Sequence, residues 1–90
     1  MIGITERAKR ELNELLFKKS DMPQARLRLT GNRTNLGMGV DIELPSDEVV
    51  KYQGKNILVV DRSLAGSLKG IVLDVDDTPQ GPQLVIDEAS

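Results

Sequence analysis

The sequence predicts an α+β fold that is mostly β, with an N-terminal helix, a compact, twisted mixed β-sheet or barrel-like core and one short internal helix. Three observations support this prediction. The first 20 residues show helical periodicity, the pattern changes to strand-like alternation after Pro23, and residues 57–60 form an unbroken aliphatic run. We expect a single domain over residues 1–90, because the chain is short and has no linker, low-complexity tract or repeat.

The first element is predicted to be a helix over residues 5–18. Its apolar side chains recur at i, i+4, i+7 and i+8 and share one face: Ala8, Leu12, Leu15 and Leu16. Thr5 is a suitable N-cap, and Pro23 closes the helical stretch. The helix is therefore expected to bury one apolar stripe against the sheet.

The rest of the chain is dominated by short strands. Strands are expected at residues 26–29, 40–44, 49–52, 57–60, 71–75 and 83–87. The run Ile57-Leu58-Val59-Val60 is typical of a central strand buried on both faces. The polar residues 31–35, and the glycine-containing stretch to Gly39, are expected to form a flexible loop.

A short helix is expected at residues 62–68, between the strands at residues 57–60 and 71–75. Asp61 or Ser63 can cap its start, and Gly70 marks its end. The remaining aliphatic residues are distributed evenly along the chain, and we expect them to form the core rather than a lipid pocket.

The composition excludes several kinds of chemistry. The chain has no cysteine and no histidine, so thiolate nucleophiles, cysteine-bound zinc, Ser-His-Asp triads and histidine metal sites are excluded. The net charge is −2, and the chain has one Phe, one Tyr and no Trp, which argues against nucleic-acid binding. No apolar signal or membrane-spanning run is present, so we expect a cytoplasmic protein that does not contact a membrane.

Several short motifs, taken in order, resemble the HesB/IscA-like family, the A-type iron–sulfur carrier proteins. The similar segments span nearly the whole chain: Ile4-Thr5 with Ala8, Arg26 to Leu29, Gly37-Met38, Gly54-Lys55, Ile57 to Asp61, Ser63-Leu64, Leu68 to Gly70, Leu73-Asp74 and Gly81 to Ile86. The resemblance implies the fold of this family.

The cluster chemistry of that family does not follow from the resemblance. The family places one cysteine two residues before the Gly-Met pair, where this chain has Asn35. Its other two cysteines form a Cys-Gly-Cys pair beyond the last strand, and we expect this tail to be lacking after Ser90. A cluster needs thiolates or, less often, imidazoles, so no iron–sulfur cluster is expected.

The resemblance places the family's active end at the loop after the first long strand. We therefore take Asn32, Arg33, Asn35 and Met38 as the candidate contact residues. A second candidate, the carboxylates Asp74, Asp76 and Asp77, suggests calcium, but Thr78 and Gln80 break the ligand series of an EF-hand. These carboxylates are better explained as a solvated strand end.

Two functions remain open at this point. The first is a non-catalytic binding or protein-interaction module that forms a homodimer or binds another protein. The alternative is a protein that binds a small ligand or a hard metal ion through Asp, Asn and backbone oxygens. No catalytic residue, metal ligand or cofactor is assigned, and an enzyme is not expected.

Overall fold

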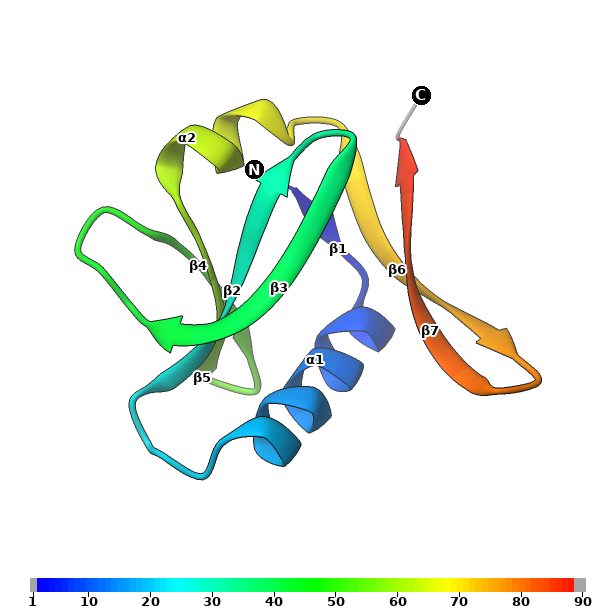
Figure 1. Ribbon diagram of the computed structural model, residues 1–90, viewed down its shortest axis with the longest axis horizontal. Coiled ribbons are helices and arrows are strands. Elements are labelled where there is room, and N and C mark those ends of the chain that lie inside the picture. The colour runs from blue at the N-terminus through cyan, green and yellow to red at the C-terminus, as the bar shows by residue number, and fades with distance from the viewer. Residues whose placement is uncertain (1, 89–90) are drawn as a thin grey trace.

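A computed structural model describes residues 2–88 of the chain. Figure 1 shows the elements in order: β1 (Gly3–Ile4), α1 (Glu6–Lys19), β2 (Ala25–Asn32), β3 (Asn35–Ile42), β4 (Glu48–Tyr52), β5 (Lys55–Val60), α2 (Arg62–Ser67), β6 (Ile71–Thr78) and β7 (Gly81–Glu88). The fold is α+β and mostly β, as the sequence predicts, with both expected helices present.

Helix α1 begins where the sequence supplies a cap. The Thr5 hydroxyl oxygen accepts a hydrogen bond from the Ala8 backbone N–H at 3.1 Å. The same hydroxyl donates to Asp74 Oδ1 at 2.8 Å, which ties the start of the helix to β6. Ala8, Leu12 and Leu16 are buried on the expected face.

Neither helix within residues 2–88 has the length and apolar run needed to cross a bilayer.

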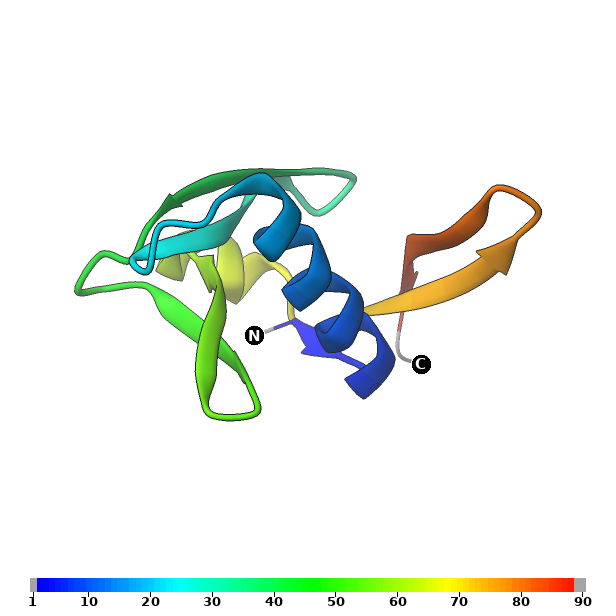
Figure 2. The ribbon, with the colours of Figure 1, turned by 90° about the horizontal axis from the view of Figure 1, so that it is seen from below.

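The strands form two sheets. One has the order β3-β2-β5-β4 and the other has the order β1-β6-β7. Both sheets are mixed, because β2 pairs with β5 and β1 pairs with β6 in parallel, whereas the other pairs are antiparallel. Figures 1 and 2 show that the β6–β7 hairpin projects to one side of the body formed by α1 and the four-stranded sheet.

The core lies between α1 and the four-stranded sheet. α1 packs against β2, β4 and β5, and the side chains of Ile57, Leu58, Val59 and Val60 are fully buried. This confirms that residues 57–60 form a central strand. Short helix α2 begins at Asp61, whose carboxylate accepts from the Ser63 N–H at 3.0 Å, so Asp61 rather than Ser63 is its cap.

Residues 31–35 do not form the flexible loop that we expected. β2 runs to Asn32, β3 begins at Asn35, and Arg33 and Thr34 make a tight turn between them. Gly31 has φ +100°, where a side chain would collide with the Asn35 carbonyl oxygen. The expected strand at 40–44 also shifts, because β3 spans Asn35–Ile42.

The expectation that all the aliphatic residues form the core is wrong at the sheet edges. Val40 and Ile42 on β3 are 44% and 53% exposed, and Leu84 and Ile86 on β7 are 37% and 45% exposed. β3 and β7 are edge strands, and within the four-stranded sheet α1 packs mainly on the other three strands, β2, β5 and β4. The apolar side chains of the edges are therefore left partly uncovered.

We predict that Leu12→Ala lowers the free energy of unfolding by about 2–5 kcal/mol and Val59→Ala by somewhat less, because both side chains are fully buried. Urea unfolding of each variant measures this change. Phe17→Ala is the matched control, since Phe17 is 76% exposed and its truncation is expected to cost less than about 0.5 kcal/mol. Equal effects of all three substitutions would contradict the core assignment.

Candidate functional site: an apolar cleft

An open cleft of about 220 Å³ lies between the β2–β3 hairpin, α1 and the β6–β7 hairpin. Its walls are almost wholly aliphatic and come from five elements: Leu15, Leu29, Leu36, Gly37, Met38, Leu73, Leu84 and Ile86. In Figure 1 it corresponds to the region where β3 and the β6–β7 hairpin face each other beside α1. Concave apolar surfaces of this kind are typical of binding sites.

Strand alternation explains why these residues share the cleft. Directly opposed residues of an antiparallel pair lie on the same face of the sheet. Leu84 lies opposite Val75, and Ile86 lies opposite Leu73. The side chains of Leu84 and Ile86 are therefore on the core-facing side of the β6–β7 hairpin. Because the hairpin projects from the body, this face is only partly covered.

The same face of β3 continues past the cleft. Met38, Val40 and Ile42 lie opposite Leu29, Leu27 and Ala25, respectively, and therefore face the α1 side of the sheet. Val40 and Ile42 line a second hollow of about 150 Å³ together with Met22. The inner face of β3 is thus an apolar stripe, which we define as Leu36, Met38, Val40 and Ile42.

Two of the predicted contact residues have structural roles within the chain. Asn32 Oδ1 accepts hydrogen bonds from the backbone N–H groups of Thr34 and Asn35, each at 3.0 Å, and thereby stabilises the hairpin turn. Arg33 donates to the carbonyl oxygens of Ser67 and Lys69 at 3.1 and 2.9 Å, at the end of α2. Both side chains anchor the β2–β3 hairpin.

The other two predicted residues lie closer to the cleft. Asn35 is the exposed first residue of β3, one residue before the cleft residue Leu36. Met38 forms part of the cleft wall and packs against the core. The structure therefore brings Met38 into the candidate site, places Asn35 next to it, and gives Asn32 and Arg33 supporting roles.

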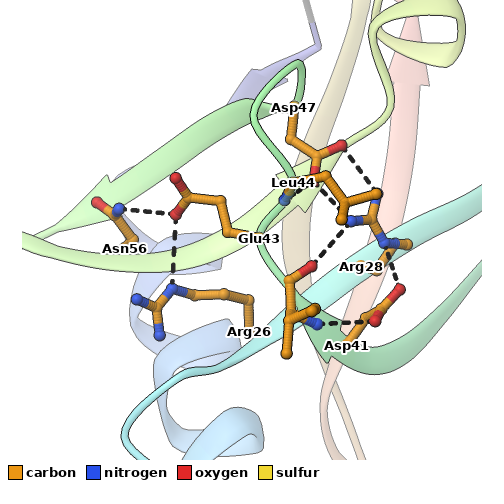
Figure 3. Close-up of polar contacts among 8 residues, drawn as sticks. Arg26, Arg28, Asp41, Glu43, Leu44, Asp47 and Asn56 are labelled. Atoms are coloured by element: carbon orange, nitrogen blue, oxygen red, sulfur yellow. Dashed lines mark hydrogen bonds and ion pairs between the residues drawn. The ribbon is translucent and has the colours of Figure 1, made fainter.

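A network centred on Arg28 of β2 holds β3 in place on the opposite face of the sheet (Figure 3). Arg28 donates from Nε to Asp41 Oδ2 at 2.7 Å, and from Nη1 and Nη2 to the two Asp47 oxygens at 3.0 and 2.6 Å. Nη2 also donates to the Ile42 carbonyl oxygen at 3.0 Å. One guanidinium thus joins β2, the end of β3 and the segment that leads into β4.

The network shifts the pKa values of its members in the direction expected for an ion pair. The pKa of Asp47 is lowered mainly by the hydrogen bond from Arg28, and the carboxylate also accepts from the Leu44 N–H at 2.8 Å. The pKa of Asp41 is lowered by its hydrogen bonds from the Ile42 N–H and from Arg28. The pKa of Arg28 is raised by Asp47, so all three groups are charged at neutral pH.

The carboxylates of β6 are also used by the fold. Asp74 accepts from the Thr5 hydroxyl, and Asp77 is paired with Arg7 of α1. The pKa of Asp77 is lowered by the hydrogen bond from Arg7, and that of Asp74 by hydrogen bonds from the Val75 N–H and Thr5. Within residues 2–88, no group of three acidic side chains is placed to hold a metal ion.

Comparison with solved structures shows the class of fold. The chain superposes on IscA, solved with a [2Fe-2S] cluster, with a TM-score of 0.62 and 18% identity over 98% of this chain and 85% of that one. It superposes on Escherichia coli SufA, a protein involved in the biosynthesis of iron–sulfur clusters, with a TM-score of 0.67 and 18% identity over 97% and 84%.

A protein from Aquifex aeolicus, solved by NMR in solution, is also similar, with a TM-score of 0.62 and 22% identity over 97% of this chain and 90% of that one. The fold is therefore HesB/IscA-like, as the sequence motifs predict, on a chain without cysteine. No protein-family model matches the sequence, and no curated protein is similar to it.

Sequence analysis missed Leu84 and Ile86, which line the cleft. The closing strand carries three consecutive apolar residues, a short run that is typical of a buried strand, so the sequence assigns Leu84 and Ile86 to the core. Their exposure depends on β7 being an edge strand of a projecting hairpin, which is a property of strand order. The sequence shows that residues 84 and 86 are apolar, but it does not show where they lie relative to β3.

We predict that Asp47→Ala lowers the free energy of unfolding by about 1.5–3 kcal/mol at neutral pH, because it removes the carboxylate that accepts two hydrogen bonds from Arg28. An Asp with a lowered folded-state pKa stabilises the fold above its unfolded pKa of about 4 and loses this contribution as the pH falls through the folded value. The wild type should therefore lose stability in acid below about pH 4, and the variant should lose less.

Urea unfolding of both proteins at pH 7 and in a series of acidic buffers measures the two effects. Asp76→Ala is the control, since Asp76 is an exposed aspartate on β6. A loss of stability equal to that of Asp47→Ala in this control would contradict the role assigned to the Arg28 network.

Proposed function

We propose that this protein is a non-catalytic protein-interaction module that uses the body of an iron–sulfur-carrier fold without the cluster. The observation that carries the proposal is the apolar cleft beside Asn35, open to solvent in a chain with no cysteine or histidine. An apolar surface that is partly exposed on a small protein favours association with another protein. We place this interaction in the cytoplasm, as expected from the sequence.

The ionisable groups support a non-enzymatic role. Four carboxylates have lowered pKa values, and in each case the cause is a hydrogen bond that holds the fold together: Asp41, Asp47, Asp74 and Asp77. A general acid or base that works at neutral pH needs a carboxyl pKa shifted upward. The Arg28 network also lies on the face of the sheet opposite the cleft, so its charges do not line the cleft.

A small apolar ligand is the second candidate, and the volume of the cleft favours it over a metal ion. A cleft of about 220 Å³ with aliphatic walls suits a small apolar molecule, whereas a hard cation needs oxygen ligands. Native mass spectrometry of the purified protein distinguishes the two candidates. A bare mass, or an assembly made only of protein chains, supports the interaction module, and a defined small-molecule adduct supports the alternative.

A substitution in the apolar cleft tests directly whether the cleft binds the protein partner. We expect Leu84→Glu to abolish binding of the protein partner, self or other, because it places a charge in the cleft. The matched control is Phe17→Glu, which puts the same charge on an exposed apolar position outside the cleft and should leave binding intact. Equal binding by both variants would contradict the assignment of the cleft.

We predict that the purified protein takes up no stoichiometric iron–sulfur cluster. The iron atoms of a cluster need thiolate or imidazole ligands, and the sequence contains neither. Anaerobic reconstitution with iron and sulfide, followed by desalting and an absorbance spectrum, measures this. A stoichiometric cluster band that survives desalting would show that other ligands hold a cluster and would overturn the proposal.

A further inference from the structure

The apolar cleft continues at both ends into further hollows. At one end, Leu15 and Leu84 also line a hollow of about 200 Å³ that reaches Glu11 on α1. At the other end, the apolar stripe of β3 leads to the hollow at Val40 and Ile42. In Figure 1, β3 begins beside the β6–β7 hairpin and ends on the far side of the molecule. The three hollows therefore form one surface that follows α1, which we call the α1 groove.

The helix beside the α1 groove gives a measure of its length. Glu11 and Leu15 line the hollows at one end, and Ser20, directly after α1, lines the hollow at the other end. At a rise of about 1.5 Å per residue, Glu11 and Ser20 are roughly 14 Å apart along the helix axis. This length corresponds to roughly two to three turns of a second helix laid alongside α1.

The walls of the α1 groove favour a helix over an extended segment. The cleft and the hollow at Val40 expose almost only apolar atoms. An extended segment against such walls would leave its backbone N–H and C=O groups unpaired, which costs free energy. A helix forms these hydrogen bonds within itself and can place an apolar stripe in the groove. An amphipathic helix is therefore the element that fits these walls.

The β6–β7 hairpin gives the α1 groove a negative charge. Residues 71–88 contain five carboxylates and no lysine or arginine: Asp74, Asp76, Asp77, Asp87 and Glu88. Two of them are paired with arginines of other elements, and the other three form no ion pair within residues 2–88. The α1 residues on the same helix face as Glu11 are neutral in sum: Arg7, Glu11, Glu14 and Lys18. The hairpin therefore sets the sign of the charge, which attracts basic side chains and repels anionic lipid or nucleic acid.

We infer that the α1 groove binds a basic amphipathic helix of another protein. This helix lies alongside α1, with its apolar face in the cleft and its lysine or arginine side chains towards the β6–β7 hairpin. The inference rests on the proposed interaction function and names the chemistry of the partner. Within residues 2–88, α1 is itself basic and amphipathic, but its apolar face is buried in its own core, and α2 has only six residues. A second copy of the described chain therefore offers no free helix of this kind.

Synthetic peptides test which charge the groove selects. The probe is a fluorescein-labelled peptide of about 18 residues, long enough to form a helix, with leucine at i, i+3, i+4 and i+7 and lysine at the remaining positions. We expect saturable binding by fluorescence anisotropy, and a dissociation constant at least about tenfold higher when glutamate replaces every lysine. A peptide with the lysine composition in a scrambled order, which has no apolar stripe, should also bind at least about tenfold more weakly.

Substitutions locate the bound peptide on the protein. Glu11→Lys reverses a charge that lines the groove, and we expect it to raise the dissociation constant of the lysine peptide about fivefold or more. The matched control is Glu48→Lys, which makes the same change on β4, at the opposite edge of the sheet from β3. This control should change the dissociation constant by less than about twofold.

A second pair of variants tests the apolar wall without a change of charge. Val40→Ser removes apolar surface from the hollow at the end of the groove, and we expect the dissociation constant to rise about threefold or more. Val49→Ser on β4 is the matched control and should leave binding of the lysine peptide unchanged. Circular dichroism of each variant alone checks that it folds.

The conformation of the bound peptide is a separate readout. The circular dichroism spectrum of the complex, minus that of the protein alone, should be the spectrum of a helix. A strand-like difference spectrum would mean that the peptide pairs with an open strand edge, and it would overturn the inference.

The outcomes separate this inference from the proposed function. Lack of saturable binding, equal binding of the lysine and glutamate peptides, or equal effects within either pair of variants overturns the α1 groove as the site of a basic helix. If Leu84→Glu still abolishes binding of a protein partner, such as a second copy or an acidic protein, the interaction module stands and only its partner changes. A defined small-molecule adduct without any protein partner overturns both.

Discussion

The ion pair between Arg28 and Asp47 is the interaction on which the arrangement around the cleft depends. The Asp47 side chain is 1% exposed, and the guanidinium of Arg28 offsets the cost of shielding this charge from water by donating two hydrogen bonds to it. Its cost is offset further by the Leu44 N–H and by the bonds from Arg28 to Asp41 and the Ile42 carbonyl. The pair fixes the end of β3 relative to β2, and β3 forms one wall of the cleft.

Local patterns predicted the elements that depend on local physics. The stripe from Ala8 to Leu16 and the Thr5 cap define α1 almost to the residue, and four consecutive aliphatic residues identify β5 as the central strand. The hairpin at residues 31–35 was missed because glycine and polar residues are equally typical of a loop and of a tight turn. Positive φ at Gly31 and the hydrogen bonds of Asn32 decide between them, and neither is visible in the sequence.

The candidate site was predicted in part, through the resemblance rather than through periodicity. Met38 lies in the cleft wall and Asn35 beside it, because the Gly-Met motif marks the strand that borders the cleft. Arg33 was expected to contact a partner, but it binds the carbonyl oxygens at the end of α2, 34 and 36 residues further along the chain. Long-range contacts of this kind depend on the order of the strands in the sheets, which local sequence patterns do not reveal. The position of β7 relative to β3 depends on the same strand order.

Most of the aliphatic residues are buried, and the need for a core explains their presence. The aliphatic residues that stay exposed on β3 are not explained in this way, and they form its apolar surface. Leu12, Leu27 and Leu58 are fully buried, and the fold needs them. Val40 and Ile42 lie on an edge strand beyond the cover of α1, where threonine would keep the β propensity without exposing an apolar surface. Their exposed area, beside an edge that lacks lysine and proline, favours aggregation unless a specific partner covers it. These two side chains contribute little to the core and increase the risk of aggregation. Their presence is best explained by a binding partner that covers them.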